Sequence, residues 1–231
     1  MAIPKLDHIV ILLPVSADPE ALLHEAEPFK KDFTLSPGGF HTDKKTQNVL
    51  ISLADGVYIE LIAFTSSSAT KDHPWGQGKP TRIIDFACLG HPHHKEVYSE
   101  GRPGGRGECK WVVTPPKPEW GVGRIPFWCE DITPRDLRVP KPTEHPCGVN
   151  AVKKIIILVE SERQQKRLTE LYQEIVGAEE IKVGTPSGGD VTIDIRVAEN
   201  KEERETLVRD GWGIYKVEFD IPGLVLSNSI F

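Results

Sequence analysis

Two ionisable side chains stand in apolar stretches of the sequence where core strands are expected. His8 opens the run "HIVILL" directly after Asp7, and Glu60 lies inside "VYIELIAF". A carboxylate buried in such a strand costs several kcal/mol unless it is paired, protonated or bound to a cation. A histidine on a neighbouring strand meets that need, so His8 and Glu60 predict a metal site or an acid–base pair. A hydrogen-bonded core pair is the structural alternative.

Two further polar residues are placed to serve a pocket around this pair. An apolar environment raises the pKa of a carboxylic acid, so Glu60 is expected to act as a base near neutral pH. His41 lies in the Gly-rich stretch "GGFHT", and Asn48 begins the next apolar run. At a pocket rim, His41 would carry a proton and Asn48 would hydrogen-bond a substrate oxygen. An ordinary turn histidine and an ordinary polar residue at a strand start are the alternatives.

Aromatic residues and an arginine follow in the stretch "PFWCEDITPR", which puts Phe127, Trp128 and Arg135 near a strand end. Aromatic side chains with one arginine suit a small molecule that is aromatic or carries a carboxylate, bound in an apolar pocket. Packing between parts of the fold is the alternative. Trp128 and Arg135 are the candidates for substrate binding.

The elements that must position these residues occur twice along the chain. The first part is expected to form a strand, a helix, a Gly-rich turn and two strands, over residues 6–14, 16–33, 34–42, 48–53 and 57–64. Pro19 suits the first helical position, and Pro28 is expected to end or kink the helix. The last part repeats this order over residues 151–159, 161–177, 184–191, 191–198 and 214–221, with Ser161 at the helix start and Gly177 at its end.

This order predicts an α+β fold of tandem βαβββ modules, with cupped mixed sheets and the helices outside. The first module spans residues 1–65, and the second spans residues 150–231. Between them lies a Pro- and Gly-rich insertion, residues 66–149, with the additional strands "RIIDFACL", "CKWVVT" and "IPFWCEDI". We expect these strands to join the sheets, to supply pocket walls and to complete one compact unit.

The sequence resembles the glyoxalase-like domain family of the vicinal-oxygen-chelate superfamily, in a fungal-type member. The resemblance covers nearly the whole chain and rests on "LDHIVILLP", "PGGFHTDKKTQNVLISLADGVYIELIAF", "RIIDFACL", "PFWCEDITPRDLRVP" and "HPCGV". It implies that His8 and Glu60 are ligands of one divalent metal, Zn, Mn, Ni or Fe, and a site without metal is the equal alternative. His41, His145 or Glu130 would supply further ligands.

The second module departs from the family's metal pattern. Aligning "LDHIVI" with "AVKKIIILV" puts Lys154 where His8 stands, and aligning "GVYIEL" with "GIYKVE" puts Val217 where Glu60 stands. Lys154 would then carry positive charge into a cup and bind a substrate carboxylate. A register shift of one residue would leave it solvated instead.

The resemblance implies a small-molecule enzyme of isomerase or lyase type that transfers a proton next to a carbonyl. Because the second module lacks the ligand pair, a protein of the same fold that sequesters a small molecule without chemistry is the alternative. A third class, a ring-cleaving enzyme that activates oxygen, requires two histidines and one carboxylate around iron, and the strands offer only His8.

Composition narrows the partners and the compartment. The 231-residue chain carries a formal net charge of −6, which gives no basic field for nucleic acid. Its apolar runs are far shorter than the roughly 20 residues that cross a bilayer. The four cysteines lack CxxC spacing and no signal segment is apparent, so we expect free thiols in a cytoplasmic protein that is a monomer or homodimer.

Overall fold

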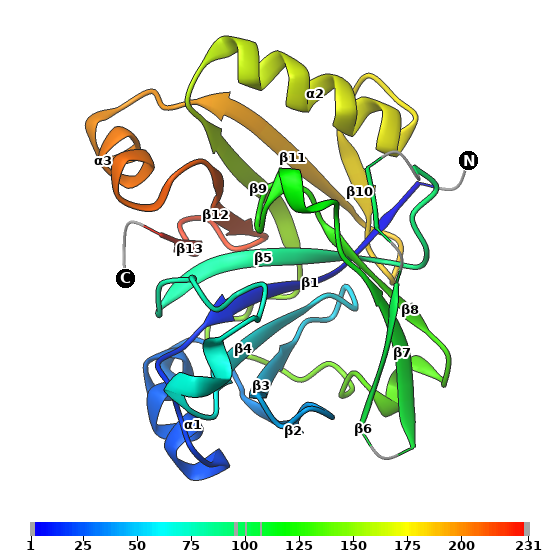
Figure 1. Cartoon of the computed structure of the whole chain (residues 1–231), viewed down its shortest axis with the longest axis vertical. Helices are drawn as coiled ribbons and strands as arrows, with labels where there is room; N and C mark the ends of the chain where they lie inside the picture. Colours follow the sequence, from blue (N-terminus) through cyan, green and yellow to red (C-terminus); the bar gives the residue numbers. More distant parts are fainter. Residues whose placement is uncertain (1–2, 95–96, 100, 107, 229–231) are drawn as a thin grey trace.

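One mixed sheet with three α-helices forms the protein, as the predicted α+β architecture requires (Figure 1). The computed structural model describes residues 3–94, 97–99, 101–106 and 108–228, with side chains for all of these except 102–106. The strands are β1 (Lys5–Leu12), β2 (Ser36–Phe40), β3 (Thr46–Ser52), β4 (Tyr58–Phe64), β5 (Arg82–Leu89), β6 (Arg102–Arg106), β7 (Cys109–Thr114), β8 (Phe127–Asp131), β9 (Val152–Val159), β10 (Lys182–Gly184), β11 (Asp190–Val197), β12 (Gly213–Phe219) and β13 (Val225–Ser227). The α-helices are α1 (Pro19–Glu25), α2 (Glu162–Val176) and α3 (Lys201–Asp210), and short 3₁₀ helices occupy Glu27–Lys31, Ser67–Thr70, Pro118–Trp120 and Arg135–Leu137.

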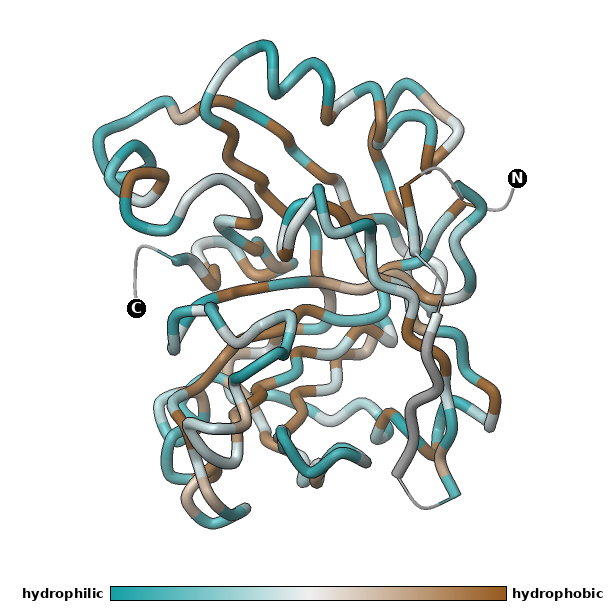
Figure 2. The backbone as a smooth tube through the Cα atoms, viewed as in Figure 1, coloured by the Kyte–Doolittle hydropathy of each residue, from teal (hydrophilic) through white to brown (hydrophobic). Residues whose placement is uncertain are grey.

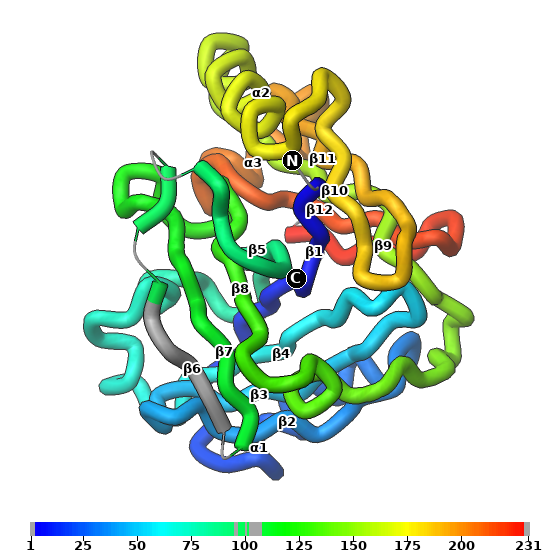
Figure 3. The backbone as a smooth tube through the Cα atoms, turned by 90° about the vertical axis from the view of Figure 1, so that its right-hand side faces the viewer, coloured from blue at the N-terminus to red at the C-terminus, as the bar shows by residue number. Residues whose placement is uncertain are grey.

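Strand β1 is the centre of a cup. It pairs in parallel with β4, which continues through β3 to β2, and antiparallel with β5. Strand β5 pairs in parallel with β8, which continues through β7 to β6. The strand order of this part is therefore β2-β3-β4-β1-β5-β8-β7-β6. The strands β4-β3-β2 beside β1 and the strands β8-β7-β6 beside β5 are paired in the same way, and these two halves of the sheet curl toward each other (Figure 3).

The C-terminal part of the chain forms the other end of the sheet. Strand β9 pairs in parallel with β11 and antiparallel with β12, and β10 joins this group to β1 through Lys5 and Gly184. Helices α2 and α3 lie on the outside of this end (Figure 1). Along the tube of Figure 2, the strands carry most of the hydrophobic colour and α2 shows hydrophilic stretches that suit a solvent-facing helix.

A β-bulge in β1 sets the directions of its side chains. Leu6 opposes Cys88 and His8 opposes Ala87, so two residues of β1 face one residue of β5 around Asp7. Beyond the bulge the strand alternates, with Ile9 in the large core and Val10 on the cup side. In a regular strand, the side chains of Asp7 and His8 would point to opposite faces. The bulge therefore lets these two adjacent side chains meet.

The first helix ends near Pro28, as the sequence predicts: α1 ends at Glu25, and Pro28 lies in the 3₁₀ segment Glu27–Lys31, because proline interrupts the α-helical hydrogen bonds. Another expected element differs from the structure. The turn expected over 34–42 contains β2, a bulged edge strand. A Cβ at Gly38 would lie 2.0 Å from Asn48 Oδ1, so glycine permits this close pairing with β3.

The structure also describes the thiols and the helices. All four cysteines are free, as expected. Within the described ranges, each helix is too short or too polar to cross a lipid bilayer.

Candidate active site

A pocket of about 760 Å³ opens inside the cup, and its lining residues come from β1, β3, β4, β5, β7, β8 and the connections between them. His8, Asn48 and Glu60 line it together with His41, which follows β2. The structure thus brings together all of the residues predicted as catalytic and one predicted to bind substrate.

The His8 ring is held by a stacked ring, an edge-on ring and a carboxylate. It stacks on Tyr58, with ring centroids 4.6 Å apart, and Phe127 meets it edge-on at 5.2 Å. Its Nδ1 donates to Asp7 Oδ2 over 2.9 Å. Because the ionised Asp7 accepts from Nδ1, the other ring nitrogen, Nε2, is directed to the pocket and to Glu60.

Two arginines keep Asp7 ionised in the protein interior. Asp7 is fully buried, and it accepts hydrogen bonds from Arg135 and from Arg138 Nη1, the latter over 2.9 Å. Burial raises the pKa of Asp7, but Arg138, the His8 hydrogen bond and Arg135 outweigh it and hold the pKa well below its usual range. Asp7 is therefore the fixed anion that orients His8.

Glu60 is the carboxylate at the centre of the pocket wall. It is 5% exposed, and Asn48 Nδ2 donates to its Oε1. His8 Nε2 lies 3.5 Å from Oε2, and His41 Nε2 lies 3.5 Å from Oε1. Glu60 reaches this place because β4 alternates, with Tyr58 and Glu60 on the cup side and Ile59 in the large core.

The expected rise in the pKa of Glu60 is wrong. Burial does raise it, but the hydrogen bond and charge of His41, the charge of His8 and the Asn48 amide together lower the pKa to about 2. Glu60 is thus an anion at neutral pH, and it is too weakly basic to be matched to proton abstraction there.

His41 connects the Glu60 carboxylate to the rim of the pocket. Its side chain is 23% exposed, and its Nδ1 lies 2.6 Å from Thr46 Oγ1. The His41 backbone N–H also donates to the Thr46 carbonyl, which closes the connection between β2 and β3. The ring is therefore fixed at one nitrogen and partly open to a bound molecule.

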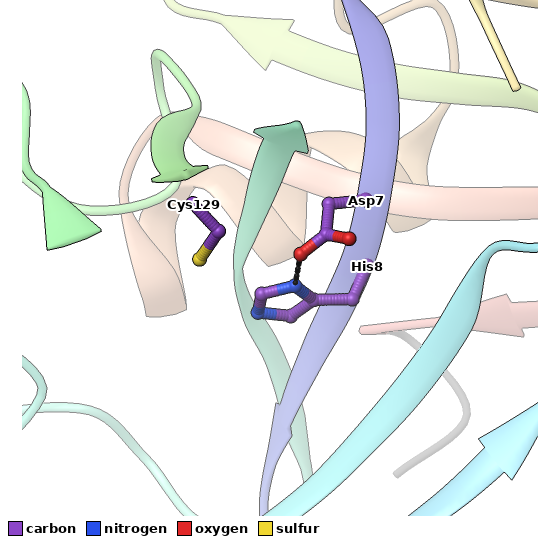
Figure 4. A group of neighbouring side chains, drawn as sticks. All are labelled: Asp7, His8 and Cys129. Carbon is purple, nitrogen blue, oxygen red and sulfur yellow. Dashed lines mark hydrogen bonds and ion pairs between the residues drawn. The ribbon is translucent and has the colours of Figure 1, made fainter. Parts of the chain in front are cut away.

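Asp7, His8 and Cys129 form a close group, but they fit a metal ion poorly. Their ligand atoms lie within 4.8 Å of one another, and Figure 4 shows the sulfur facing the His8 ring. The Asp7 carboxylate is already bound by two arginines. Burial and the charge of Asp7 hold the pKa of the Cys129 thiol well above its usual range, which disfavours the thiolate that a metal needs.

A different set of side chains offers the donor types of a divalent-cation site. His8 Nε2 and His41 Nε2 each lie 3.5 Å from a Glu60 oxygen, which exceeds ordinary hydrogen-bond lengths. A carboxylate that orients a ligand histidine through its other nitrogen, as Asp7 does for His8, is typical of metal centres. The two imidazoles approach different oxygens of Glu60, however, and among the described residues only Asp7, His8 and Cys129 bring three such ligand atoms within 4.8 Å of one another.

Other predicted site residues lie outside the pocket. Trp128 points to the opposite face of β8 from Phe127 and packs edge-on against Tyr98. Arg135 binds Asp7 and the Gly56 carbonyl, so it supports His8 rather than facing the cavity.

Lys154 also lies away from the pocket. It sits on β9 opposite Thr192 and Glu218, at the far end of the sheet from the cup. The strands that close the cup include β5, β7 and β8, which the sequence predicts as strands that supply pocket walls, but their pairing partners have no local signal.

The two alternative metal ligands are placed elsewhere. His145 binds the Thr34 amide and lies 3.1 Å from the Ser52 carbonyl oxygen, and burial lowers its pKa. Glu130 faces His91 at the surface. Of the further ligands considered, the structure brings only His41 to Glu60.

Several pocket residues are absent from the sequence predictions. These include Tyr58, Trp75, Asp85, Trp111, Cys129 and Arg138, whereas Phe127 was named with the aromatic residues of "PFWCEDITPR". One signal was present in the sequence: a buried Asp7 needs cationic partners, and Arg135 and Arg138 follow shortly after β8, which ends at Asp131. The remaining residues gain their roles from strand pairing across the cup.

Comparisons with known proteins agree with this fold. Residues 6–176 match the family of glyoxalase-like domains. A hypothetical protein from Staphylococcus aureus superposes with a TM-score of 0.60 at 13% identity, over 85% of this chain and 87% of the other. A mutant of 4-hydroxymandelate synthase from Streptomyces coelicolor gives 0.52 at 11% identity, over 94% and 71%. Methylmalonyl-CoA epimerase from Mycobacterium tuberculosis gives 0.40 at 17% identity, over 58% and 92%. No curated protein matches the sequence.

Proposed function

The chain belongs to the family of glyoxalase-like domains, and on that premise we propose that it is an enzyme of isomerase or lyase type. It transfers a proton next to a carbonyl of a small molecule bound in the cup. One observation carries the proposal: the buried anion Glu60 lies between the Nε2 atoms of His8 and His41 in the wall of a cavity of about 760 Å³. Cytoplasmic location and fungal origin stay predictions of the sequence.

The residues of the pocket divide the work between binding and proton transfer. Trp111 and Phe127 give the cavity apolar walls, which exclude water from a bound molecule. His8 is held in one orientation by Asp7 and Tyr58, so its Nε2 is preorganised toward the substrate carbonyl. His41, which is partly exposed, is the group that gives a proton to the carbonyl oxygen and takes it back.

A metal-dependent form of the same reaction is the alternative. His8, Glu60 and His41 would then hold a divalent cation, and His41 would be a ligand instead of the proton carrier; Zn, Mn, Ni and Fe all accept imidazole and carboxylate ligands. When bound, the cation would polarise a substrate carbonyl as a Lewis acid.

Elemental analysis of the purified protein tests the metal. We expect one divalent metal per chain, lost from the double variant His8→Ala, Glu60→Gln and retained in Glu205→Gln, a control on the exposed face of α3. Bound iron would favour the ring-cleaving oxygenase class, since His41 supplies the second histidine that this class requires. Protein that folds and carries the same metal content in the double variant would exclude this centre as the metal site.

Deuterium uptake from heavy water tests the chemistry without knowledge of the substrate. The probes are 2-hydroxy aldehydes, 2-hydroxy ketones and 2-methyl-branched thioesters, each with a C–H next to a carbonyl. Mass spectrometry should show uptake above the protein-free rate for at least one probe. The double variant should lose that uptake, whereas Glu205→Gln should keep it; uptake that persists in the double variant contradicts the proposed roles.

A sequestering protein is the second candidate, and the aromatic walls favour it. Trp75, Trp111 and Phe127 line the cavity and can hold a hydrophobic molecule without any reaction. A molecule that copurifies, is released on denaturation and rebinds unchanged would support sequestration. Turnover of that molecule by the native protein would exclude it.

A further inference from the structure

We propose that Asp85 is the carboxyl group that removes the substrate's carbon-bound proton and returns it, and that Trp75 is its positioning residue. The inference deepens the proposed function and rests on it, because it names the base of that reaction. It assigns the carbon-directed and oxygen-directed proton transfers to different walls of one pocket.

Asp85 occupies the wall that β5 contributes. It lines the same pocket as His8, Glu60 and His41, and it is 5% exposed. In the sheet it opposes Val10 of β1, while Glu60 opposes the same Val10 from β4 on the other side. A substrate that lies over β1 on the cup side of the sheet would therefore have a carboxyl group on either side.

Among the described residues, neutral donors hold the Asp85 carboxyl and no cation pairs with it. Trp75 Nε1 donates to Oδ2 over 2.9 Å, and the amides of Phe86 and Gly123 donate to Oδ1 over 3.0 and 3.3 Å. Asp7, which is also buried, has two arginines instead. A buried carboxyl group without a neighbouring cation can bind a proton near neutral pH, whereas a salt-bridged carboxyl group stays ionised there.

The backbone around Gly123 is shaped to reach this carboxyl. Gly123 has φ +72°, and a Cβ there would lie 2.5 Å from the Ile84 carbonyl oxygen. Only glycine permits both the conformation and the approach. The segment thus brings an amide N–H to Asp85 at a position where a side chain has no room.

The titration of Asp85 agrees with its geometry. Burial raises its pKa to about 7 and outweighs the lowering effect of the Trp75, Phe86 and Gly123 hydrogen bonds. Among the described side chains, Tyr172 of α2 is the titratable group that responds to Asp85, and burial keeps the pKa of its phenol well above the usual value. The pocket also holds other titratable side chains: His73 beside Trp75, Asp43, Lys117, Tyr58, Cys129 and Arg138, together with His8, His41 and Glu60 of the centre described above.

The carboxyl groups of Glu60 and Asp85 therefore have different pKa values, as the two members of an acid–base pair require. Glu60 stays an anion, and Asp85 exists in both forms near neutral pH. The Asp85 carboxylate takes the proton from the carbon next to the carbonyl, and the C–H electron pair forms the C=C bond of an enol while the carbonyl π pair takes a proton from His41. Reversal of the transfer to the other face or to a neighbouring carbon gives the isomer, with no net gain or loss of protons or electrons.

Asp55 is the matched control, because it has a purely structural place. It is buried and also lacks a salt bridge, and its carboxylate accepts from the Val57 and Val152 amides. Burial raises its pKa as well. Asp55 does not line the pocket, so it separates the effect of a buried carboxyl from the effect of a catalytic one.

The experiment combines deuterium uptake with carbon-13 NMR of protein labelled at the aspartate side-chain carboxyl. In the wild type, one signal that disappears in Asp85→Asn should titrate near pH 7, and uptake of deuterium by an active probe should rise with pH around the same midpoint. Asp85→Asn should lower uptake about 100-fold or more. Asp55→Asn should retain it in folded protein, as judged by circular dichroism.

Trp75→Phe tests positioning. Loss of the indole donor should shift the Asp85 midpoint upward and shift the uptake profile with it, which a merely structural tryptophan would not do. Uptake that persists in Asp85→Asn, or an Asp85 signal that titrates below pH 5, overturns this inference and leaves the proposed function standing. Wild-type protein that exchanges none of the probes overturns both.

Discussion

At the residue scale, the active centre is a row of ion pairs and hydrogen bonds that begins with Arg135, which does not line the pocket, and Arg138, which does. Arg135 and Arg138 bind Asp7, Asp7 binds His8, and His8 faces Glu60. Each carboxylate of this row is held as an anion by its neighbours, so the row orients the His8 ring with little freedom. The arginine that the sequence suggested as a substrate anchor, Arg135, belongs to this support.

Substituting Asp7→Asn should destabilise the fold by about 3 kcal/mol, because two arginines then lose a buried anion. Urea unfolding at pH 7 measures this change in the free energy of unfolding. The control Asp136→Asn, at an exposed position of the 3₁₀ segment Arg135–Leu137, should stay within about 0.5 kcal/mol of the wild type.

The Asp7 effect should also depend on pH in a defined direction. The pKa of Asp7 is depressed in the folded state, so its stabilisation is present above the unfolded pKa of about 3.9 and is lost as the pH falls below it. The gap between wild type and Asp7→Asn should therefore narrow in acid. A constant gap from pH 7 to pH 2 would show that charge is not the cause.

The sequence reveals the residues whose burial is visible in their own strand. His8 and Glu60 stand in apolar runs, and the structure brings them to one pocket. Trp128 and Lys154 could not be placed, because the face of a residue depends on bulges and strand partners that lie far away in sequence. The lowered pKa of Glu60 was missed for the same reason, since it depends on His41 and Asn48 across the cup.

At the element scale, glycines with positive φ have two different roles. Gly177 ends α2 in the left-handed conformation with open space around it, and the sequence predicts this end. Gly123 has the same φ but lies against the Ile84 carbonyl. Gly177→Ala should therefore cost about 1 kcal/mol from strain alone, and Gly123→Ala clearly more.

Thermal unfolding of the two glycine variants makes the comparison. The melting temperature of Gly123→Ala should fall further than that of Gly177→Ala. Equal decreases would mean that the Gly123 segment shifts freely, so that its amide does not hold Asp85.

Helix α3 is fastened to β11 by one buried charge pair, and the sequence patterns do not predict this helix. Arg196 donates to both oxygens of Glu203, over 2.8 and 2.6 Å, and Asn200 caps the helix. Its exposed surface is so polar that it lacks the apolar stripe on which a helix prediction depends. The contact that stabilises it spans two elements.

Glu203→Gln should lower stability by about 2 kcal/mol at pH 7. The Arg196 hydrogen bonds lower the pKa of Glu203 to about 2, so its stabilisation is present above the unfolded pKa of about 4.3 and is lost as the pH falls toward 2. Urea unfolding at pH 7 and at pH 2.5 should show the difference shrink. Glu205→Gln, on the same helix and exposed, should change little at either pH.

At the scale of the whole molecule, one core joins the cup to the C-terminal end of the sheet. The largest apolar cluster contains Ile9 and Ile59 of the cup together with Ile155 and Ile193. The Asn228 side chain accepts from the Ile83 amide and donates to carbonyls of β5 and β12. The sequence indicates the elements of both ends, but their pairing is non-local and has no local pattern to reveal it.

The shared core predicts a single unfolding transition in calorimetry. Asn228→Ala leaves the Ile83 amide and two carbonyls without their buried partner, so it should lower the melting temperature without dividing the transition. Two separate transitions, in the wild type or in the variant, would show that the ends fold independently. The division of the chain into a first module (1–65), an insertion (66–149) and a second module (150–231) stays a prediction.

The place of Trp75 gives the protein a built-in optical signal. Trp75 lies in the wall between the main cavity and a second one of about 320 Å³, and it lines both together with Pro74, Gly121 and Val122. A molecule that enters either cavity displaces water from the same indole, and its emission should respond. Fluorescence titration with compound libraries, compared with Trp75→Phe, then identifies occupants of either cavity before any turnover assay exists.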